Sequence, residues 1–390
     1  MRHSRSIASL ILLLAASPAA AWWDPDWEAR ATLSIENATV SADRAGIVAL
    51  VELDASRIDY GNVDALGDDL RFVDGDDLTE LAYDIEEWNP AGTSWIWVSV
   101  PLIEGTPTPD AIFLYWGNPA AAAGEDEAAT WTDGTFVIVH HFDAGLVNPV
   151  SGLDGALFLG ASTGAGLFGD ALEVDGSNDY FQADDSLFDH LEDPTALEFW
   201  IATTDAGSND AFLAPAVTGY RDPASPSTVQ LWGWLDAAGH IGMRYGLKET
   251  LGTSVVNDGD WHHVILVRYV DGDHQVWVDG VLETHSQGVA GVDTLNFRAS
   301  SYYGIGRAGS TAGGYGYIDA QIDEYRIHTS ARTPDEYYEV DYLAQSGGLL
   351  DYCALSDFGI DGDGDGHGSN VVQVASCDEP PGYAPPGDCN

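Results

Sequence analysis

The chain carries a run of alternating aspartates near its end, in the stretch DGDGDG. Asp361, Asp363 and Asp365 supply hard oxygen ligands at alternate positions, and the glycines between them let the backbone wrap tightly around one ion, as Ca²⁺ requires. An EF-hand would need a glutamate at the twelfth loop position, where this chain has Val372. The remaining ligands would therefore come from Asp388 or from backbone carbonyls. The pattern predicts calcium binding by the three aspartates, with a flexible acidic spacer as the alternative.

Two adjacent histidines lie in the stretch DGDWHHVILVRYVDGDHQVWVDG, residues 258–280, and invite a metal or catalytic interpretation. From Trp261 onward the periodicity is that of a strand, and a strand sends successive side chains to opposite faces. His262 and His263 therefore cannot ligate one ion together. Two Asp-Gly turn signals follow, so we interpret the stretch as a hairpin. Trp261 is then a buried core residue, and the histidines belong to the scaffold.

Glycan hydrolysis would need two carboxylates that face one cleft, roughly 5 to 10 Å apart. Three alternating carboxylates on one strand would place such groups on a single face, but no strand-like stretch of the sequence contains three. We therefore expect no catalytic residues and no enzymatic activity. The nearest patterns are the pairs Glu173/Asp175, Asp319/Asp323 and Glu339/Asp341, and the adjacent Glu86 and Glu87, which would lie on opposite faces of a strand.

The three cysteines all lie near the end of the chain, at Cys353, Cys377 and Cys389. Cys377 and Cys389 flank a Pro/Gly-rich loop, so we predict a disulfide between these two, which leaves Cys353 without a partner. Residues 1–21 combine a basic start, a short apolar core and a small-residue cleavage site, which is typical of a secretory signal peptide. We expect a secreted or cell-surface protein. No stretch reaches the roughly 20 apolar residues that span a bilayer.

The charge of the chain limits the classes of molecule that we expect it to bind. There are 63 acidic against 14 basic residues, a formal net charge of −49. Encounters with nucleic acid or with an anionic membrane would begin with repulsion, so neither is expected as a partner.

Most of the chain has the pattern of short strands separated by turn residues. Residues 93–101, 111–119 and 196–202 are apolar on both faces, as in strands buried in a sandwich. Glycine is frequent and long helical patterns are scarce, which favours antiparallel β-sandwiches. One helix is expected, with Thr333 as N-cap and Pro334 at its first position.

Three segments resemble known families. Residues 22–122, with WWDPDWEARATLSI and IFLYWGNPAA at their ends, resemble a bacterial β-rich domain of unknown function from exported proteins. Residues 136–352, with ALEVDGSNDYF, ALEFWIAT, the histidine hairpin and YIDAQIDEYRIH, resemble a concanavalin A-like, laminin-G-type jelly roll. That resemblance implies a Trp-His-His-Val strand within the sheet, and a second calcium site near Asp175, Asp179 and Asp323. The acidic tail, residues 353–390, is similar to thrombospondin type-3 calcium-binding repeats.

These patterns predict an all-β chain with a signal peptide (1–21), a β-rich domain (22–122), a linker (123–135), a concanavalin A-like domain (136–352) and a calcium-binding tail (353–390). We expect a non-enzymatic protein for glycan or surface recognition or adhesion, which binds a glycan or a surface glycoprotein. The alternatives are a secreted glycan-degrading hydrolase on the jelly roll and a structural cell-envelope protein. An aromatic groove without paired carboxylates would favour recognition. A pair of carboxylates in one groove would favour the hydrolase, and a groove filled by the protein's own loops would favour the structural protein.

Overall fold

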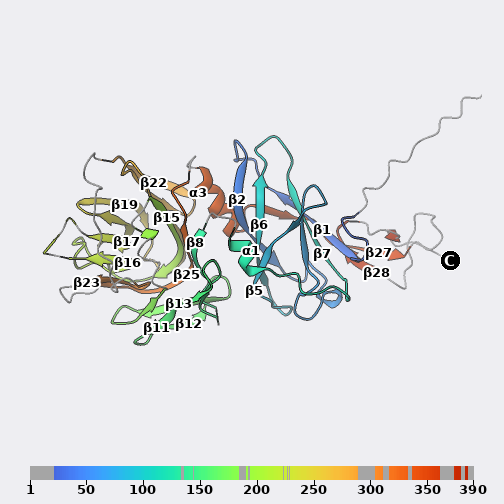
Figure 1. Cartoon of the computed structure of the whole chain (residues 1–390), viewed down its shortest axis with the longest axis horizontal. Helices are drawn as coiled ribbons and strands as arrows, with labels where there is room; N and C mark the ends of the chain where they lie inside the picture. Colours follow the sequence, from blue (N-terminus) through green and yellow to red (C-terminus); the bar gives the residue numbers. More distant parts are fainter. Residues whose placement is uncertain are drawn as a thin grey trace, which may run out of the picture.

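The computed structural model describes residues 22–132, 136–143, 145–183, 190–191, 194–222, 224–225, 227, 229–288, 304–310, 316–332, 336–360, 373–378 and 383–384. Strands dominate these residues and form two β-units next to each other, which confirms the predicted all-β class (Figure 1). The predicted signal peptide and the predicted calcium ligands Asp361, Asp363 and Asp365 lie outside the described residues. No helix in the described part of the chain is long and apolar enough to cross a membrane.

The N-terminal unit consists of a five-stranded and a three-stranded antiparallel sheet packed face to face. Alternate side chains of its strands point into one shared core, to which β6 contributes Ile96, Val98 and Val100. The opposite face of β6 carries Trp95 and Trp97, so the predicted strand with two apolar faces is confirmed. The five-stranded sheet runs β26 (Leu350–Tyr352), β1 (Ala29–Ile35), β7 (Ala111–Trp116), β3 (Arg71–Asp74) and β4 (Glu80–Leu81), and the other runs β2 (Arg44–Leu53), β6 (Ser94–Ile103) and β5 (Tyr83–Glu87).

The jelly-roll unit packs an eight-stranded sheet against a six-stranded sheet around a core that includes Phe199, Trp232 and Leu266. The histidine stretch forms β20 and turns directly into β21, which confirms the predicted hairpin. The larger sheet contains β12 (Ser162–Ala165), β13 (Asp170–Asp175), β25 (Asp319–His328), β15 (Thr195–Thr203), β20 (Trp261–Arg268), β21 (His274–Val278), β22 (Val281–Ser286) and β8 (Phe136–His140), which pairs with β25. The smaller contains β19 (Lys248–Val255), β18 (His240–Tyr245), β17 (Gln230–Leu235), β16 (Ala216–Arg221), β23 (Arg307–Ser310) and β24 (Gly316–Tyr317).

Short elements complete the described chain. In the predicted linker, α1 (Glu127–Trp131) begins at the N-cap Asp126, whose side chain accepts a hydrogen bond from the backbone N–H of Ala129. Elsewhere there are the 3₁₀ turn η1 (Tyr60–Asn62), the pair β9 (Val147–Asn148) and β10 (Leu153–Asp154), and the pair β11 (Ala156–Phe158) and β14 (Tyr180–Gln182).

After β25 the chain returns to the N-terminal unit. The expected helix is present as α3 (Glu336–Gln345), which packs on β2. β26 then pairs with β1, so Leu350 lies opposite Ile35. The helix α3 and the strand β26, which the sequence analysis placed in the 136–352 segment, thus complete the N-terminal unit. The helix α3 contacts both units.

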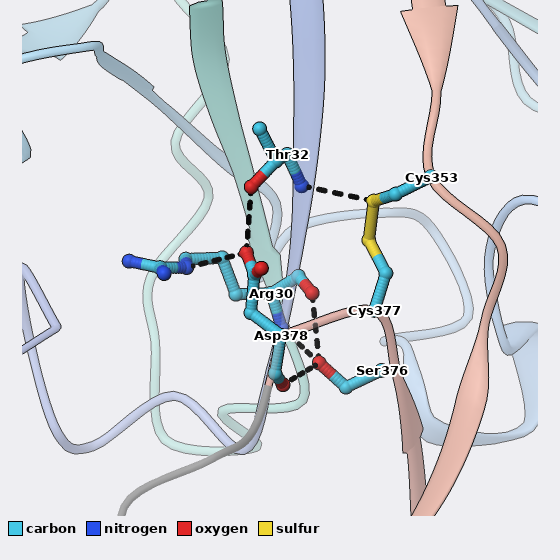
Figure 2. The surroundings of a disulfide bond; sticks show 6 residues. All are labelled: Arg30, Thr32, Cys353, Ser376, Cys377 and Asp378. Atoms are coloured by element: carbon cyan, nitrogen blue, oxygen red, sulfur yellow. Dashed lines mark hydrogen bonds and ion pairs between the residues drawn. A yellow bond between two sulfur atoms is a disulfide. The ribbon is translucent and has the colours of Figure 1, made fainter. Parts of the chain in front are cut away.

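The predicted Cys377–Cys389 disulfide is wrong, because Cys377 is bonded to Cys353. The antiparallel pairing of β27 (Ser356–Ile360) with β28 (Gln373–Ser376) brings the two Cα atoms to 5.9 Å, within the range that a disulfide needs. Figure 2 shows the bridge beside β1, where the backbone N–H of Thr32 donates to Sγ of Cys353. Cys389 lies outside the described residues, as β29 (Tyr383–Ala384) is the last described element.

Candidate recognition cleft

The two units meet through a tryptophan-rich interface. The outward face of β15 and β8 in the jelly-roll unit packs against the outward face of β2 and β6 in the N-terminal unit. Because both strand sets are apolar on both faces, each supplies its own core with one face and this interface with the other. The buried residues at the interface are Val48, Leu50, Trp97, Trp131, Phe136, Val139, Phe168 and Trp200.

A cleft of about 320 Å³ opens at the edge of this interface. Three tryptophans line it: Trp95 from β6, Trp200 from β15 and Trp261 from β20. Trp261 lies opposite Ala202 and His263 opposite Trp200, so the two jelly-roll tryptophans share the outward face of adjacent strands. The other lining residues are Leu50, Glu52, Leu167, Phe168, Gln345, Ser346 and Gly347.

The tryptophans differ in how firmly they are held. Trp200 is only 6% exposed and its indole N–H donates to Oε1 of Gln345 at 3.1 Å. Phe168 packs edge-on against Trp95 and Trp200, with ring centroids 5.4 and 5.9 Å away. Trp95 and Trp261 are only partly buried, and within the described chain no group accepts a hydrogen bond from either indole N–H. The sequence prediction that Trp261 is a buried core residue is therefore wrong.

Among the described residues that line the cleft, Glu52 is the one carboxylate. It forms an ion pair with Arg57 at 2.7 Å, and its backbone N–H donates a hydrogen bond to the hydroxyl oxygen of Tyr352. An acid and a base on opposite sides of a glycosidic bond are therefore not available here. The cleft offers aromatic surface from three tryptophans.

Beneath the cleft, a buried cluster fixes Trp200 and α3. The two carboxylate oxygens of Glu198 lie 2.9 Å from Nε2 of His263 and 2.8 Å from Nε2 of His328. The side-chain amide of Gln345 also donates to Glu198. Burial alone would raise the pKa of Glu198, but the hydrogen bonds from the two histidines hold it well below its usual value. Glu198 is thus held in a buried, hydrogen-bonded cluster, in which Nδ1 of His328 has no partner within the described chain.

His262 lies on the other face of β20, as the alternation predicts. Its Nδ1 is 2.9 Å from Oδ2 of Asp279, and its Nε2 is 3.2 Å from Oδ1 of Asp258. The hydrogen bond to Asp279 raises the pKa of His262 to about 9. The two imidazole side chains thus have separate carboxylate partners on opposite faces of the strand, as the alternation predicts.

A second, acidic groove of about 450 Å³ lies on the large sheet. Asp175 of β13 pairs in register with Asp319 of β25, and Glu173 lies two residues from Asp175 on the same face. Asp179 turns back so that its carboxylate accepts a hydrogen bond from the backbone N–H of Asp175 at 3.0 Å. These four carboxyl groups line one groove.

The sequence pattern missed this grouping because it compared carboxylates along one strand, whereas these come from two paired strands. Burial raises the pKa of Asp179, and the backbone N–H of Ser177 lowers that of Asp175. Asp323, which the jelly-roll resemblance placed with Asp175 and Asp179, does not line the groove. It is buried and accepts hydrogen bonds from the backbone N–H groups of Leu167 and Phe168.

Two family models match parts of the chain. Residues 175–336 match the concanavalin A-like lectin/glucanases superfamily. Residues 66–147 match a domain of unknown function, DUF2341. Two parts of the chain thus match these two families, which confirms both predicted resemblances; the resemblance of the tail to calcium-binding repeats stays a prediction. A search of curated proteins finds no match.

A comparison with solved structures gives matches of low similarity. The binding domain of Paraclostridial Mosquitocidal Protein 1 is 14% identical, with a TM-score of 0.39 over 55% of this chain and 52% of that one. The CBM40 of Ruminococcus gnavus IT-sialidase is 12% identical, with a TM-score of 0.35 over 44% of this chain and 96% of that one. A mutant Trypanosoma rangeli sialidase is 11% identical, with a TM-score of 0.40 over 61% of this chain and 41% of that one. The chain spans about half the length of the first of these, and scores at this level do not indicate a shared ligand.

Proposed function

We propose that this is an exported, non-enzymatic recognition protein that binds the end of a glycan in the tryptophan cleft between its two units. The observation that carries the proposal is the convergence of Trp95, Trp200 and Trp261 on one open cleft. Aromatic faces bind the apolar C–H faces of sugar rings, and indole N–H groups donate to sugar hydroxyls. Trp95 and Trp261 present both features in a cavity of ligand-site size.

The charge of the chain supports an uncharged glycan. The net charge of −49 repels sulfated, phosphorylated and sialylated chains. Of the cleft residues, Glu52 adds a carboxylate that Arg57 already pairs. A neutral hexose or N-acetylhexosamine end therefore fits the site better than an acidic sugar.

A glycan screen tests this proposal. Labelled full-length protein is applied to an array of neutral and acidic glycans, in buffer with calcium and again with chelator. Retention on neutral glycans that disappears in the Trp261→Ala variant is expected. Trp88→Ala is the matched control, because Trp88 is also partly buried but lies in the core of the N-terminal unit and donates to the carbonyl of Ala65. Absence of any glycan binding, or equal binding by Trp261→Ala, would contradict the proposal.

The acidic groove favours a second candidate, the glycan hydrolase. Glu173, Asp175, Asp179 and Asp319 share one groove, which is the arrangement that this alternative requires. Two observations weigh against it. Glu173 is already engaged by the hydroxyl of Ser162 and the amide of Gln321, and none of the described residues that line the groove is aromatic. Release of reducing sugar that Glu173→Gln or Asp319→Asn abolishes would establish the hydrolase.

A further inference from the structure

A separate buried cluster lies deeper in the interface and joins side chains from both units. Glu86 extends from β5 of the N-terminal unit, Glu324 from β25 of the jelly-roll unit, and His141 follows β8. Nδ1 of His141 lies 2.9 Å from Oε2 of Glu86 and 2.8 Å from Oε1 of Glu324. The three side chains are 6% exposed or less. Three groups that commonly ligate metals thus converge at one buried point.

Hydrogen bonding alone does not account for this geometry. One ring nitrogen carries at most one hydrogen, yet Nδ1 of His141 faces two carboxylate oxygens at nearly equal distance. Within the described chain, Oε1 of Glu86 and Nε2 of His141 are buried without a hydrogen-bond partner. In the Glu198 cluster each carboxylate oxygen has its own histidine nitrogen, although Nδ1 of His328 and Oδ2 of Asp341 also lack a partner within the described chain. A buried polar atom without a partner is costly, so the arrangement indicates a missing group.

The side chains around the cluster form the outer layer that metal sites use to orient their ligands. Oδ2 of Asp84 lies 3.6 Å from Nε2 of His141 and is itself held by the indole N–H of Trp131 at 2.7 Å. Nε of Arg326 donates to the second oxygen of Glu324 at 3.1 Å. A carboxylate next to the free ring nitrogen of a histidine is the usual support for a metal-bound imidazole.

The backbone of β25 is distorted at the point where it supplies a ligand. Ile322 and Tyr325 both point into the jelly-roll core, although regular alternation would place residues three apart on opposite faces. The register instead shifts between Glu198 and Trp200 on β15, and Glu324 has a φ of 50°. A left-handed glutamate in a strand is strained, and bulges of this kind re-aim side chains at functional sites. Here the bulge turns Glu324 out toward His141.

The charges of the cluster also favour a cation. Asp84, Glu86, Asp323 and Glu324 are four buried carboxyl groups, against the guanidinium of Arg326 and the imidazole of His141. A divalent cation would neutralise the excess negative charge.

We propose that Glu86, His141 and Glu324 bind one divalent transition-metal ion that bridges the two units. An imidazole nitrogen with two carboxylates suits Zn²⁺ and its neighbours rather than Ca²⁺, which prefers oxygen ligands alone. Three protein ligands leave a further position for water. The proposed ligands include no residue that lines the tryptophan cleft and none of Asp361, Asp363 and Asp365.

The proposal is tested on full-length protein produced in zinc-supplemented medium and dialysed against metal-free buffer. About one zinc per chain is expected by elemental analysis, with at least a tenfold lower zinc content in Glu86→Gln and in Glu324→Gln. The control is His262→Ala, which removes the surface histidine between Asp258 and Asp279. This variant should retain the zinc of the wild type. Zinc-free wild-type protein, or full zinc content in both glutamine variants, would overturn the proposal.

X-ray absorption on zinc-loaded wild-type protein keeps the test decisive if the variants fail to fold. The expected spectrum shows oxygen and nitrogen ligands with one imidazole. A sulfur ligand, or a shell with two or more imidazoles, would place the zinc elsewhere and overturn the proposal.

Discussion

Nε2 of His263 lies 2.9 Å from Oε1 of Glu198, on the neighbouring strand of the large sheet and beneath the cleft. His262, one residue earlier, points to the other face and binds Asp279 and Asp258. The two adjacent histidines thus belong to two ion pairs on opposite sides of one sheet. His263 acts through Glu198 and Gln345 to hold Trp200 in the floor of the cleft.

Removal of Glu198 should strongly destabilise the protein. Glu198→Ala leaves His263 and His328 buried without their common partner, and breaking a buried ion pair in this way costs about 3–5 kcal/mol. Chemical denaturation measures the free energy of unfolding. His285→Ala is the control, because it breaks the partly exposed pair with Asp273, which should cost less than about 1 kcal/mol. Equal losses for the two variants would contradict the assignment.

The pair of His262 with Asp279 should make stability fall in mildly alkaline solution. The pKa of His262 is raised from 6.5 to about 9 in the folded protein. The contribution of this pair to the free energy of unfolding is therefore complete below about pH 6.5 and disappears as the pH rises through about 9. Because the pair is partly solvated, the loss should be about 1 kcal/mol. Unfolding free energies of wild type and His262→Gln across this window should converge at the alkaline end, and a constant difference would refute the assignment.

The Cys353–Cys377 bridge should stabilise the C-terminal segment. The two cysteines are 24 residues apart in the sequence, and for a loop of this length the chain-entropy model gives a stabilisation of about 3 kcal/mol. Cys353→Ser and Cys377→Ser should therefore lower the melting temperature equally, whereas Cys389→Ser should not. Differential scanning calorimetry under non-reducing conditions makes the comparison. A melting temperature that falls in Cys389→Ser and not in Cys353→Ser would restore the pairing predicted from the sequence.

Calcium binding by the acidic tail stays a prediction. Asp363→Ala should weaken calcium binding at least tenfold, because the alternating aspartates are its expected ligands. Asp175→Ala is the informative companion, since it alters the acidic groove of the jelly roll instead. Isothermal titration with Ca²⁺ separates the two. Calcium affinity that is unchanged in Asp363→Ala would leave the acidic spacer as the better interpretation.

Local patterns in the sequence were sufficient for the strands and for the direction of their side chains. The alternation around Trp261 correctly separated His262 from His263, and the two apolar faces of residues 93–101 correctly indicated a strand buried on both sides. Both features depend on neighbours in the sequence, which a strand places at fixed positions.

Features that depend on strand pairing or on the second unit could not be predicted in this way. The partner of Cys377 follows from the pairing of β27 with β28, and the acidic groove follows from the register of Asp175 with Asp319. Trp261 has the apolar character of a core residue, and only the position of the N-terminal unit makes it the wall of a cleft. The outward turn of Glu324 required a bulge that no alternation rule contains.

The central claim is that both units build one glycan site, and the affinities of two tryptophan variants test it most directly. Isothermal titration with the neutral glycan selected by the screen compares wild type with Trp95→Ala from the N-terminal unit and Trp261→Ala from the jelly-roll unit. Each variant should raise the Kd at least tenfold, about 1.4 kcal/mol, with Trp88→Ala unchanged. A wild-type Kd in Trp95→Ala would contradict a site shared between the units.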